Sequence, residues 1–284
     1  MEQQSNNPLK KYYRQPKIYI SLPSKGKYYP PGALDFEPTG EYPVYPMTAK
    51  DELSFKTPDA LLNGQSTVDV IQSCIPAIKN AWALPSLDLD AVLIAIRIAT
   101  FGETMDMNID VPGTDIERGF VVDLRILMDQ FANVNFEDTI QIDQFTVTLA
   151  PLTYKDFTEQ SLKSFEEQRV FAIVNNTDMA EDEKISAFQQ SFKKLTELNI
   201  NTVVKSIQSI SVDGETVTDR AMIDEFVANC DKNFFQGITD HLSAQKEKFQ
   251  IAPMTVETTE EERAAGAPEK FEVPIVFDQA HFFG

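Results

Sequence analysis

The chain has 284 residues, 42% of them hydrophobic and 20 of them phenylalanine, and its formal net charge at pH 7 is −19. A chain of this size can bury a core in one large domain or two ordinary ones, and its acidity argues against nucleic acid as the main partner, because phosphate binding needs a basic surface. The longest apolar run is far shorter than the roughly 18 residues of a membrane span, so no membrane span is expected.

The N-terminal segment differs in charge from the rest of the chain. Residues 1–34 hold six Lys and Arg residues against Glu2 alone, a net charge of +5, so the other 250 residues carry −24. The stretch LKKYYRQPK suggests an arm that docks to an acidic neighbour, and a flexible solvated tail is the alternative. The candidate partner-binding residues of the arm are Lys10, Lys11, Tyr12, Tyr13 and Arg14. No apolar signal-peptide region precedes them, so a cytosolic protein is expected.

Two similar phrases occur about a hundred residues apart. They are YPMTAKDELSFKT (residues 45–57) and LAPLTYKDFTEQSLKS (149–164), and each follows a strand-like stretch. Thr48 and Thr153 can each cap a helix, with an acidic residue three positions later in the first turn. Each phrase therefore predicts a strand-to-helix transition. The repetition itself has two explanations, independent use of the same local chemistry or a duplication that produced two related halves.

The first half combines strands with helices. KIYIS and EYPVYP are predicted strands, the second at an edge because proline cannot donate to a ladder. Residues 66–80 predict a helix that Pro76 ends or kinks. ALPSLDLDAVLIAIRIATFGE predicts a central helix, capped by Ser86, stopped by Gly102 and carrying Phe101 on its apolar face. Period-two alternation then predicts one hairpin across Pro112-Gly113 and another around Asp143-Gln144.

The second half is predicted to be mostly helical from Thr153 to Gln208. An apolar stripe typical of a core-facing helix consists of Ile185, Phe188, Phe192, Leu195 and Leu198. ISVDGETV predicts a type I′ hairpin, followed by helices at 219–229, capped by Thr218, and at 231–249. The acidic residues 253–270 are expected to form an exposed loop or linker.

The final stretch, KFEVPIVFDQAHFFG, predicts a strand with an aromatic end. Its terminal phenylalanines either pack into the protein's own core, which the sequence favours, or insert into a partner. Phe282 and Phe283 are therefore the second group of candidate partner-binding residues.

Recognisable catalytic and metal motifs are missing from the sequence. His241 and His281 are the only histidines, and neither accompanies a nucleophile motif, a P-loop, a dinucleotide fingerprint or a paired Cys-x-x-Cys. Cys74 and Cys230 lie in apolar helix-like stretches and are predicted to be buried, inert thiols. The sequence thus predicts no catalytic residue, no metal ligand, no cofactor and no small-molecule substrate. An enzyme that uses carboxylates is kept as the alternative from another class.

Several phrases, taken in order, carry a resemblance. Five stretches resemble segments of the baseplate hub and hub-assembly protein family of T-even-like contractile-tailed bacteriophages. They are LPSKGKYYP, the phrase that begins YPMTAKDELS, LDAVLIAIRIATFGE, ISVDGETVTDRAMIDEFVANC and FEVPIVFDQAHFFG. The resemblance covers most of the chain. It implies other phage tail and baseplate proteins as partners, and a location in the host cytoplasm during assembly and then in the virion tail baseplate.

The resemblance also implies a departure from the family pattern. Relatives carry Cys-x-x-Cys knuckles, as in zinc ribbons, after the IRIATFGE helix and before the final strand, whereas both places here lack cysteine. A structural zinc site needs thiolate or imidazole ligands. We therefore expect metal-free remnants of zinc ribbons at Pro112-Gly113 and at 253–270, held by packing.

Together these observations predict an α+β protein of two helical blocks, each with short antiparallel β-hairpins, plus degenerate, metal-free zinc-ribbon-like β elements. The expected division is a basic arm with the first strand (1–34), an N-terminal α+β half (35–144), a mostly helical C-terminal half (145–252) and an acidic loop with the last strand (253–284). The predicted function is a structural subunit of the baseplate hub region without catalysis. A transient hub assembly factor absent from the mature virion is the alternative.

Overall fold

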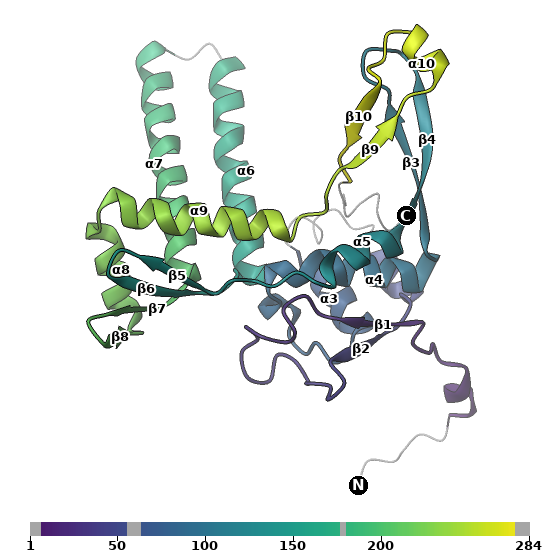
Figure 1. Ribbon diagram of the computed structural model, residues 1–284, viewed down its shortest axis with the longest axis horizontal. Coiled ribbons are helices and arrows are strands. Elements are labelled where there is room, and N and C mark those ends of the chain that lie inside the picture. Colours follow the sequence, from purple (N-terminus) through teal and green to yellow (C-terminus); the bar gives the residue numbers. More distant parts are fainter. Residues whose placement is uncertain (1–6, 56–63, 177–179, 276–284) are drawn as a thin grey trace.

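The computed structural model describes residues 7–55, 64–176 and 180–275, and it describes residues 170–176 by their backbone alone. Figure 1 shows a body from which two prongs rise, one a helical hairpin and the other a pair of β-hairpins, while the N-terminal segment extends from the opposite side. The combination of helices with small antiparallel sheets confirms the predicted α+β class.

The helices and strands alternate along the chain. The described helices are η1 Pro8–Tyr12, α1 Ala49–Phe55, α3 Gln65–Cys74, η2 Ala81–Ala83, η3 Ser86–Asp88, α4 Leu89–Phe101, α5 Leu124–Phe131, α6 Tyr154–Asn176, α7 Glu181–Ser206, α8 Arg220–Asn229, α9 Lys232–Lys248 and α10 Glu260–Ala264. The strands are β1 Ile18–Ser21, β2 Glu41–Val44, β3 Thr104–Asp110, β4 Glu117–Asp123, β5 Thr139–Ile142, β6 Phe145–Leu149, β7 Ile207–Val212, β8 Glu215–Val217, β9 Met254–Glu257 and β10 Lys270–Val273. They pair antiparallel as β1–β2, β3–β4, β9–β10 and the four-stranded sheet β5-β6-β7-β8.

The first hydrophobic core surrounds α4, as predicted. Nine of the 13 residues of this helix are buried, and it contacts α3, α5, β1 and β2. Gly102 ends the helix with φ +100°, and α3 ends at Cys74, before Pro76. Two details of the prediction are wrong. Ser86 begins a separate 3₁₀ turn instead of capping α4, and Phe101 is exposed where the Arg97 guanidinium lies over its ring.

A second core lies between the four-stranded sheet and helices α8 and α9. Its fully buried residues include Val147, Leu149, Ile207 and Ile238. Positive φ at both Asp213 and Gly214 matches the predicted type I′ turn. The cap predicted at Thr218 is wrong, because the carboxylate of the next residue, Asp219, accepts the Met222 amide at 3.1 Å.

The β prong consists of two hairpins that pack face to face. Apolar side chains of β3–β4, such as Met107 and Phe120, and of β9–β10, such as Met254 and Val256, line one narrow slot between them. Residues 253–270 therefore form β9 and α10 and lead into β10, and the prediction of an exposed loop is wrong. The sequence missed this hairpin because acidic residues dominate its solvent-facing side, whereas Met254 and Val256 face inward.

Polar contacts hold the outer end of this prong. The Arg118 guanidinium donates to the Glu257 carbonyl at 3.0 Å and to the buried Glu262 carboxylate at 3.2 Å. At the tip, Gly113 and Gly266 bring two backbones so close that a Cβ on Gly113 would lie 3.0 Å from the Gly266 carbonyl oxygen. The two segments predicted as ribbon remnants thus pack against each other.

The two similar phrases of the sequence form the same local structure. Thr48 and Asp51 exchange hydrogen bonds at the start of α1, and Thr153 and Asp156 do so at the start of α6. Each phrase follows the second strand of a hairpin, β2 or β6, so the predicted strand-to-helix transitions are confirmed. The duplication of the two halves stays a prediction.

One buried carboxylate fastens the N-terminal loop to the body. Asp88, which is fully buried, accepts hydrogen bonds from the Ser24 amide and hydroxyl, both at 2.6 Å, and from the Tyr29 hydroxyl at 3.0 Å. Burial raises the pKa of Asp88 to about 6, although these three hydrogen bonds act in the opposite direction. The stretch LPSKGKYYP is thereby held at the start of α4.

Replacing Asp88 by asparagine tests the cost of this buried charge. The pKa of Asp88 is about 6 in the folded chain and near 3.9 when unfolded. The folded state therefore binds the proton more tightly, and the stability gained below pH ~4 is lost as the pH rises to ~6. Urea titrations at each pH give the free energies of unfolding of wild type and of Asp88→Asn. The difference, wild type minus variant, should fall by up to about 3 kcal/mol between pH 4 and pH 7. A difference that does not change with pH would contradict this assignment.

The tip contact of the β prong can be tested with a pair of glycine variants. Gly113 and Gly40 have similar left-handed φ values, +79° and +73°, but nothing lies within 4 Å of a Cβ at Gly40. Gly113→Ala and Gly40→Ala therefore share a backbone cost of about 1 kcal/mol, and only Gly113→Ala adds the clash with Gly266. Hydrogen exchange should show faster opening of β9–β10 in Gly113→Ala alone. Equal exchange in the two variants would show that the tip contact does not hold the prong.

Candidate partner-binding surfaces

The N-terminal arm combines an exposed end with a fixed base. Asn7 caps the turn η1, and beyond it the side chains of Lys10 and Lys11 are exposed, with Tyr12 73% and Tyr13 56% exposed. Exposed tyrosine side chains next to two lysines form a basic surface of the composition that is typical of protein–protein interfaces. The structure therefore presents four of the five arm residues that the sequence singled out.

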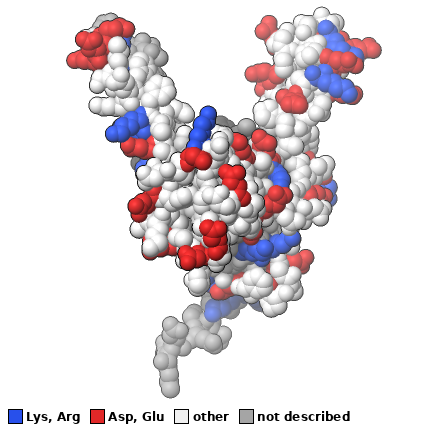
Figure 2. Space-filling model, turned by 60° about the vertical axis from the view of Figure 1, so that its left-hand side comes forward, with Lys and Arg blue, Asp and Glu red and all other residues white. Residues whose placement is uncertain are grey.

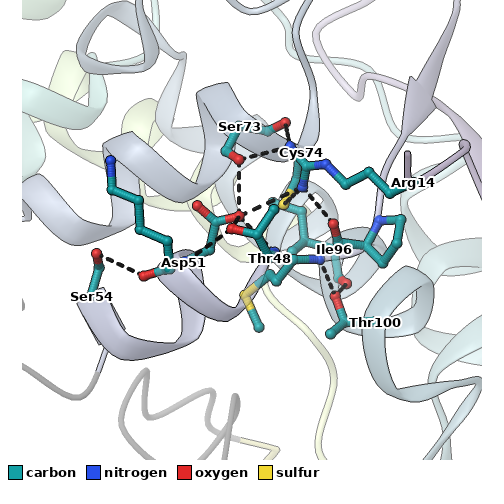
Figure 3. A network of polar contacts seen from close by, with 11 residues as sticks. Arg14, Thr48, Asp51, Ser54, Ser73, Cys74, Ile96 and Thr100 are labelled. Carbon is teal, nitrogen blue, oxygen red and sulfur yellow. Dashed lines mark hydrogen bonds and ion pairs between the residues drawn. The ribbon is translucent and has the colours of Figure 1, made fainter. Parts of the chain in front are cut away.

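Arg14, the fifth residue, is inserted into the protein's own body. Its guanidinium donates to the Pro46 carbonyl at 2.5 Å and to the carbonyl and hydroxyl of Ser73 at 2.6 and 2.8 Å. It also lies 3.6 Å from the Asp51 carboxylate and over the Tyr45 ring. Figure 3 shows these groups converging from the arm, from the start of α1 and from the end of α3. The sequence did not reveal this socket, because its parts are 30 to 60 positions apart.

The Arg14 socket extends into the cap of α1 and into α4. Asp51 accepts from Ser73 at 2.9 Å as well as from Thr48, and the Met47 amide donates to the Thr100 hydroxyl at 3.0 Å. Cys74 borders the same site, where burial, followed by the charge of Asp51, raises the pKa of its thiol to about 12. The predicted burial is confirmed for Cys74. Cys230 is only half-buried, although burial also raises its pKa.

The helical prong is the second surface. α6 and α7 lie side by side, and Glu167 of α6 accepts from Ser191 at 2.7 Å and from Lys194 at 2.9 Å. The predicted core stripe on α7 is only partly buried, since Phe188, Leu195 and Leu198 are half-buried whereas Ile185 is 49% and Phe192 62% exposed. A two-helix hairpin has too few layers to cover a whole apolar stripe, and this is why core assignment by periodicity failed here.

A hollow of about 260 Å³ lies at the root of this prong. Its lining includes Leu152, Leu198, Asp156, Glu159 and Lys205. Burial alone would raise the pKa of Asp156, but hydrogen bonds from Lys205 at 2.5 Å and from Thr153 lower it on balance. The Lys205 ammonium also lies 3.9 Å from Glu159. These acids are ion-paired, an arrangement that fastens α6 to α7.

The remaining titratable side chains that the sequence or the pKa shifts single out make contacts within the fold. Asp88, the carboxylate with the strongly raised pKa, lines neither the hollow at the root of the helical prong nor the slot within the β prong. His241 lies on α9, with its Nε2 2.7 Å from the Glu137 carbonyl oxygen. In the described part of the chain, no three His, Cys, Asp or Glu side chains converge in a way that could hold a metal ion. Phe282 and Phe283 lie outside the described residues, so their role stays a prediction.

None of the helices in residues 7–55, 64–176 and 180–275 has the length and apolarity needed to cross a bilayer. A model of one protein family, described as T4 bacteriophage base plate protein, matches residues 15–264 of the chain. The match includes the body and both prongs as far as α10, and begins directly after Arg14. No curated protein and no solved structure matches the chain.

Replacing Arg14 by alanine should release the arm. The substitution removes charge-assisted hydrogen bonds to two carbonyls and leaves Asp51 without its cation, so the free energy of unfolding should fall by about 2 kcal/mol. Cleavage after Lys17 by a lysine-specific protease should become about tenfold faster, because the arm opens more often. Arg125→Ala is the control, since Arg125 pairs with Glu103 and Asp123 on the surface and should contribute less than about 1 kcal/mol. Equal effects of the two substitutions would contradict an anchoring role for Arg14.

Proposed function

The chain belongs to the T4 bacteriophage base plate protein family, and from this premise we propose that it is a structural subunit of the hub region of a contractile-tailed phage baseplate. Membership of the family makes it a protein of the phage baseplate, and hence of the virion tail. The hub location, a period in the host cytoplasm during assembly and the absence of catalytic turnover are parts of the proposal. Its partners are other baseplate proteins, which it binds through exposed surfaces.

The family match over residues 15–264 is the observation that carries the baseplate assignment, from which the hub location is proposed. The surfaces described above support it. Lys10, Lys11, Tyr12 and Tyr13 project from a fixed base at Arg14, so a partner that binds the arm is connected directly to α1 and α3. The two prongs extend the molecule well beyond its cores (Figure 1), which increases the area available for neighbours.

The surroundings of Asp156 and Asp88 also favour binding over turnover. A carboxylate enzyme needs an accessible acid whose pKa is raised towards the working pH. Asp156, in the larger hollow, has a lowered pKa, and Asp88, with its raised pKa, is enclosed by Ser24 and Tyr29. Both arrangements fasten elements of the fold together.

Particle composition separates a retained subunit from a transient assembly factor. Mass spectrometry of purified tails should find the chain in a fixed ratio to other baseplate proteins if it is a hub subunit. A chain that is required for tail formation in infected cells but is missing from finished tails would instead be an assembly factor. This result would overturn retention in the virion.

Charge reversal in the arm tests how the chain is incorporated. The double variant Lys10→Glu/Lys11→Glu should reduce incorporation into tails by about tenfold, because it places like charges against an acidic partner. Lys232→Glu/Lys246→Glu on α9 changes two exposed lysines and the net charge equally, and should incorporate normally. Co-purification of tagged protein with tails measures both. Normal incorporation of the arm variant would make the arm a passive tail.

A further inference from the structure

The hollow at the root of the helical prong has two mostly polar walls. Each helix contributes four lining residues at positions i, i+3, i+4 and i+7, a spacing that places them on one face. They are Asp156, Glu159, Gln160 and Lys163 of α6, and Leu198, Asn201, Thr202 and Lys205 of α7. The ion pair of Asp156 with Lys205 joins the helices at the root, and the contacts of Glu167 join them again about three turns further out. The space of about 260 Å³ lies between these two attachments.

Three polar side chains of this lining are without a partner. The side chains of Gln160, Lys163 and Asn201 make no hydrogen bond or ion pair in the part of the chain that the structure describes. One ammonium group and two amide groups can together donate several hydrogen bonds to a single acceptor group. The hollow therefore presents unused donors from both helices around one space.

The charge around the hollow favours an anion. Asp156 is neutralised by Lys205 at 2.5 Å, and Glu159 lies 3.9 Å from Lys155 and also from Lys205. Together with Lys163, three lysines thus surround two acids, which gives a local net charge of +1. Figure 2 shows acidic side chains gathered at the tip of this prong and basic ones further down. An anionic group is therefore repelled by the tip and attracted towards the root.

Size and apolar contacts define the occupant further. Pockets that enclose a whole small molecule measure about 300–1,000 Å³, so a hollow of about 260 Å³ suits a single inserted side chain better. Leu152 and Leu198 line the same space and can contact methylene groups. An aspartate or glutamate side chain has both parts, because its carboxylate accepts hydrogen bonds and its CH₂ groups are apolar.

We propose that the hollow between α6 and α7 binds an aspartate or glutamate side chain of a neighbouring baseplate protein. Lys163 supplies the opposite charge, and the amide groups of Gln160 and Asn201 orient the carboxylate. The site is separate from the arm, which extends from the opposite side of the body (Figure 1). It rests on the proposed function only in that the neighbour is a baseplate protein, and it does not depend on retention in the virion.

Cross-linking with a carbodiimide tests the contact directly, because the reagent joins a lysine amine to a carboxylate only where the two touch. The sample is the tagged full chain with the baseplate proteins that co-purify with it from infected cells. Mass spectrometry should find Lys163 joined to an aspartate or glutamate of another chain. Lys163→Arg keeps the charge but lacks the reactive amine, so this cross-link should disappear while the same proteins still co-purify.

Charge variants test how much the site contributes to binding. Lys163→Glu and Asn201→Asp each place a negative charge in the hollow, and each should reduce co-purification of the cross-linked protein by about tenfold. Lys193→Glu, a charge reversal further out on the same prong, is the control and should leave co-purification unchanged. Because Lys163 has no partner within the described part of the chain, thermal unfolding of Lys163→Glu should match wild type.

The outcomes distinguish this site from the proposed function. Cross-links from Lys163 to Glu159 or Glu166 of its own helix alone would overturn the site, and so would normal co-purification of Lys163→Glu. Either result, with baseplate proteins present in the sample, leaves the proposed function intact. Absence of every baseplate protein from the wild-type sample would overturn the proposed function and the site with it.

Discussion

The burial of α4 on nearly all sides is the constraint on which the rest of the structure depends. A helix this apolar must be covered by other elements, and α3, α5, β1 and β2 do so. Its start is held through Asp88 by Ser24 and Tyr29, and near its end Thr100 accepts the Met47 amide. The arm and the β prong are attached to the core that this helix organises, whereas the root of α7 packs on the second core.

Ion pairs and caps then fix the attachments. Asp51 and Asp156 have equivalent positions in their helices, and each receives a cation from a distant part of the chain, Arg14 at 3.6 Å and Lys205 at 2.5 Å. The first contact holds the arm to the body and the second holds the root of the helical prong. The same local motif, a threonine with an acid three residues later, thus serves two different tertiary tasks.

These attachments explain how the molecule can offer separated candidate binding surfaces. The arm, the outer part of α7 and the β prong are each secured at the base and exposed further out. At the outer end of the β prong, the ion pair of Arg118 with Glu262 holds its two hairpins together. A baseplate protein built in this way could hold neighbours on opposite sides of its body, which is consistent with its family.

The sequence by itself determined the elements whose signals are local. Gly102 and Pro76 mark helix ends, Asp213-Gly214 a turn, and Thr48 and Thr153 helix starts, because each acts through its own backbone or its immediate neighbours. Only the tertiary structure decided which apolar stripe is covered and which polar residues meet. The stripe of α7 has the periodicity of a core helix, but Ile185 and Phe192 remain largely exposed, since two helices cannot enclose a whole stripe. Arg14 looks like part of a solvated arm, yet its partners come from residues that only folding brings together.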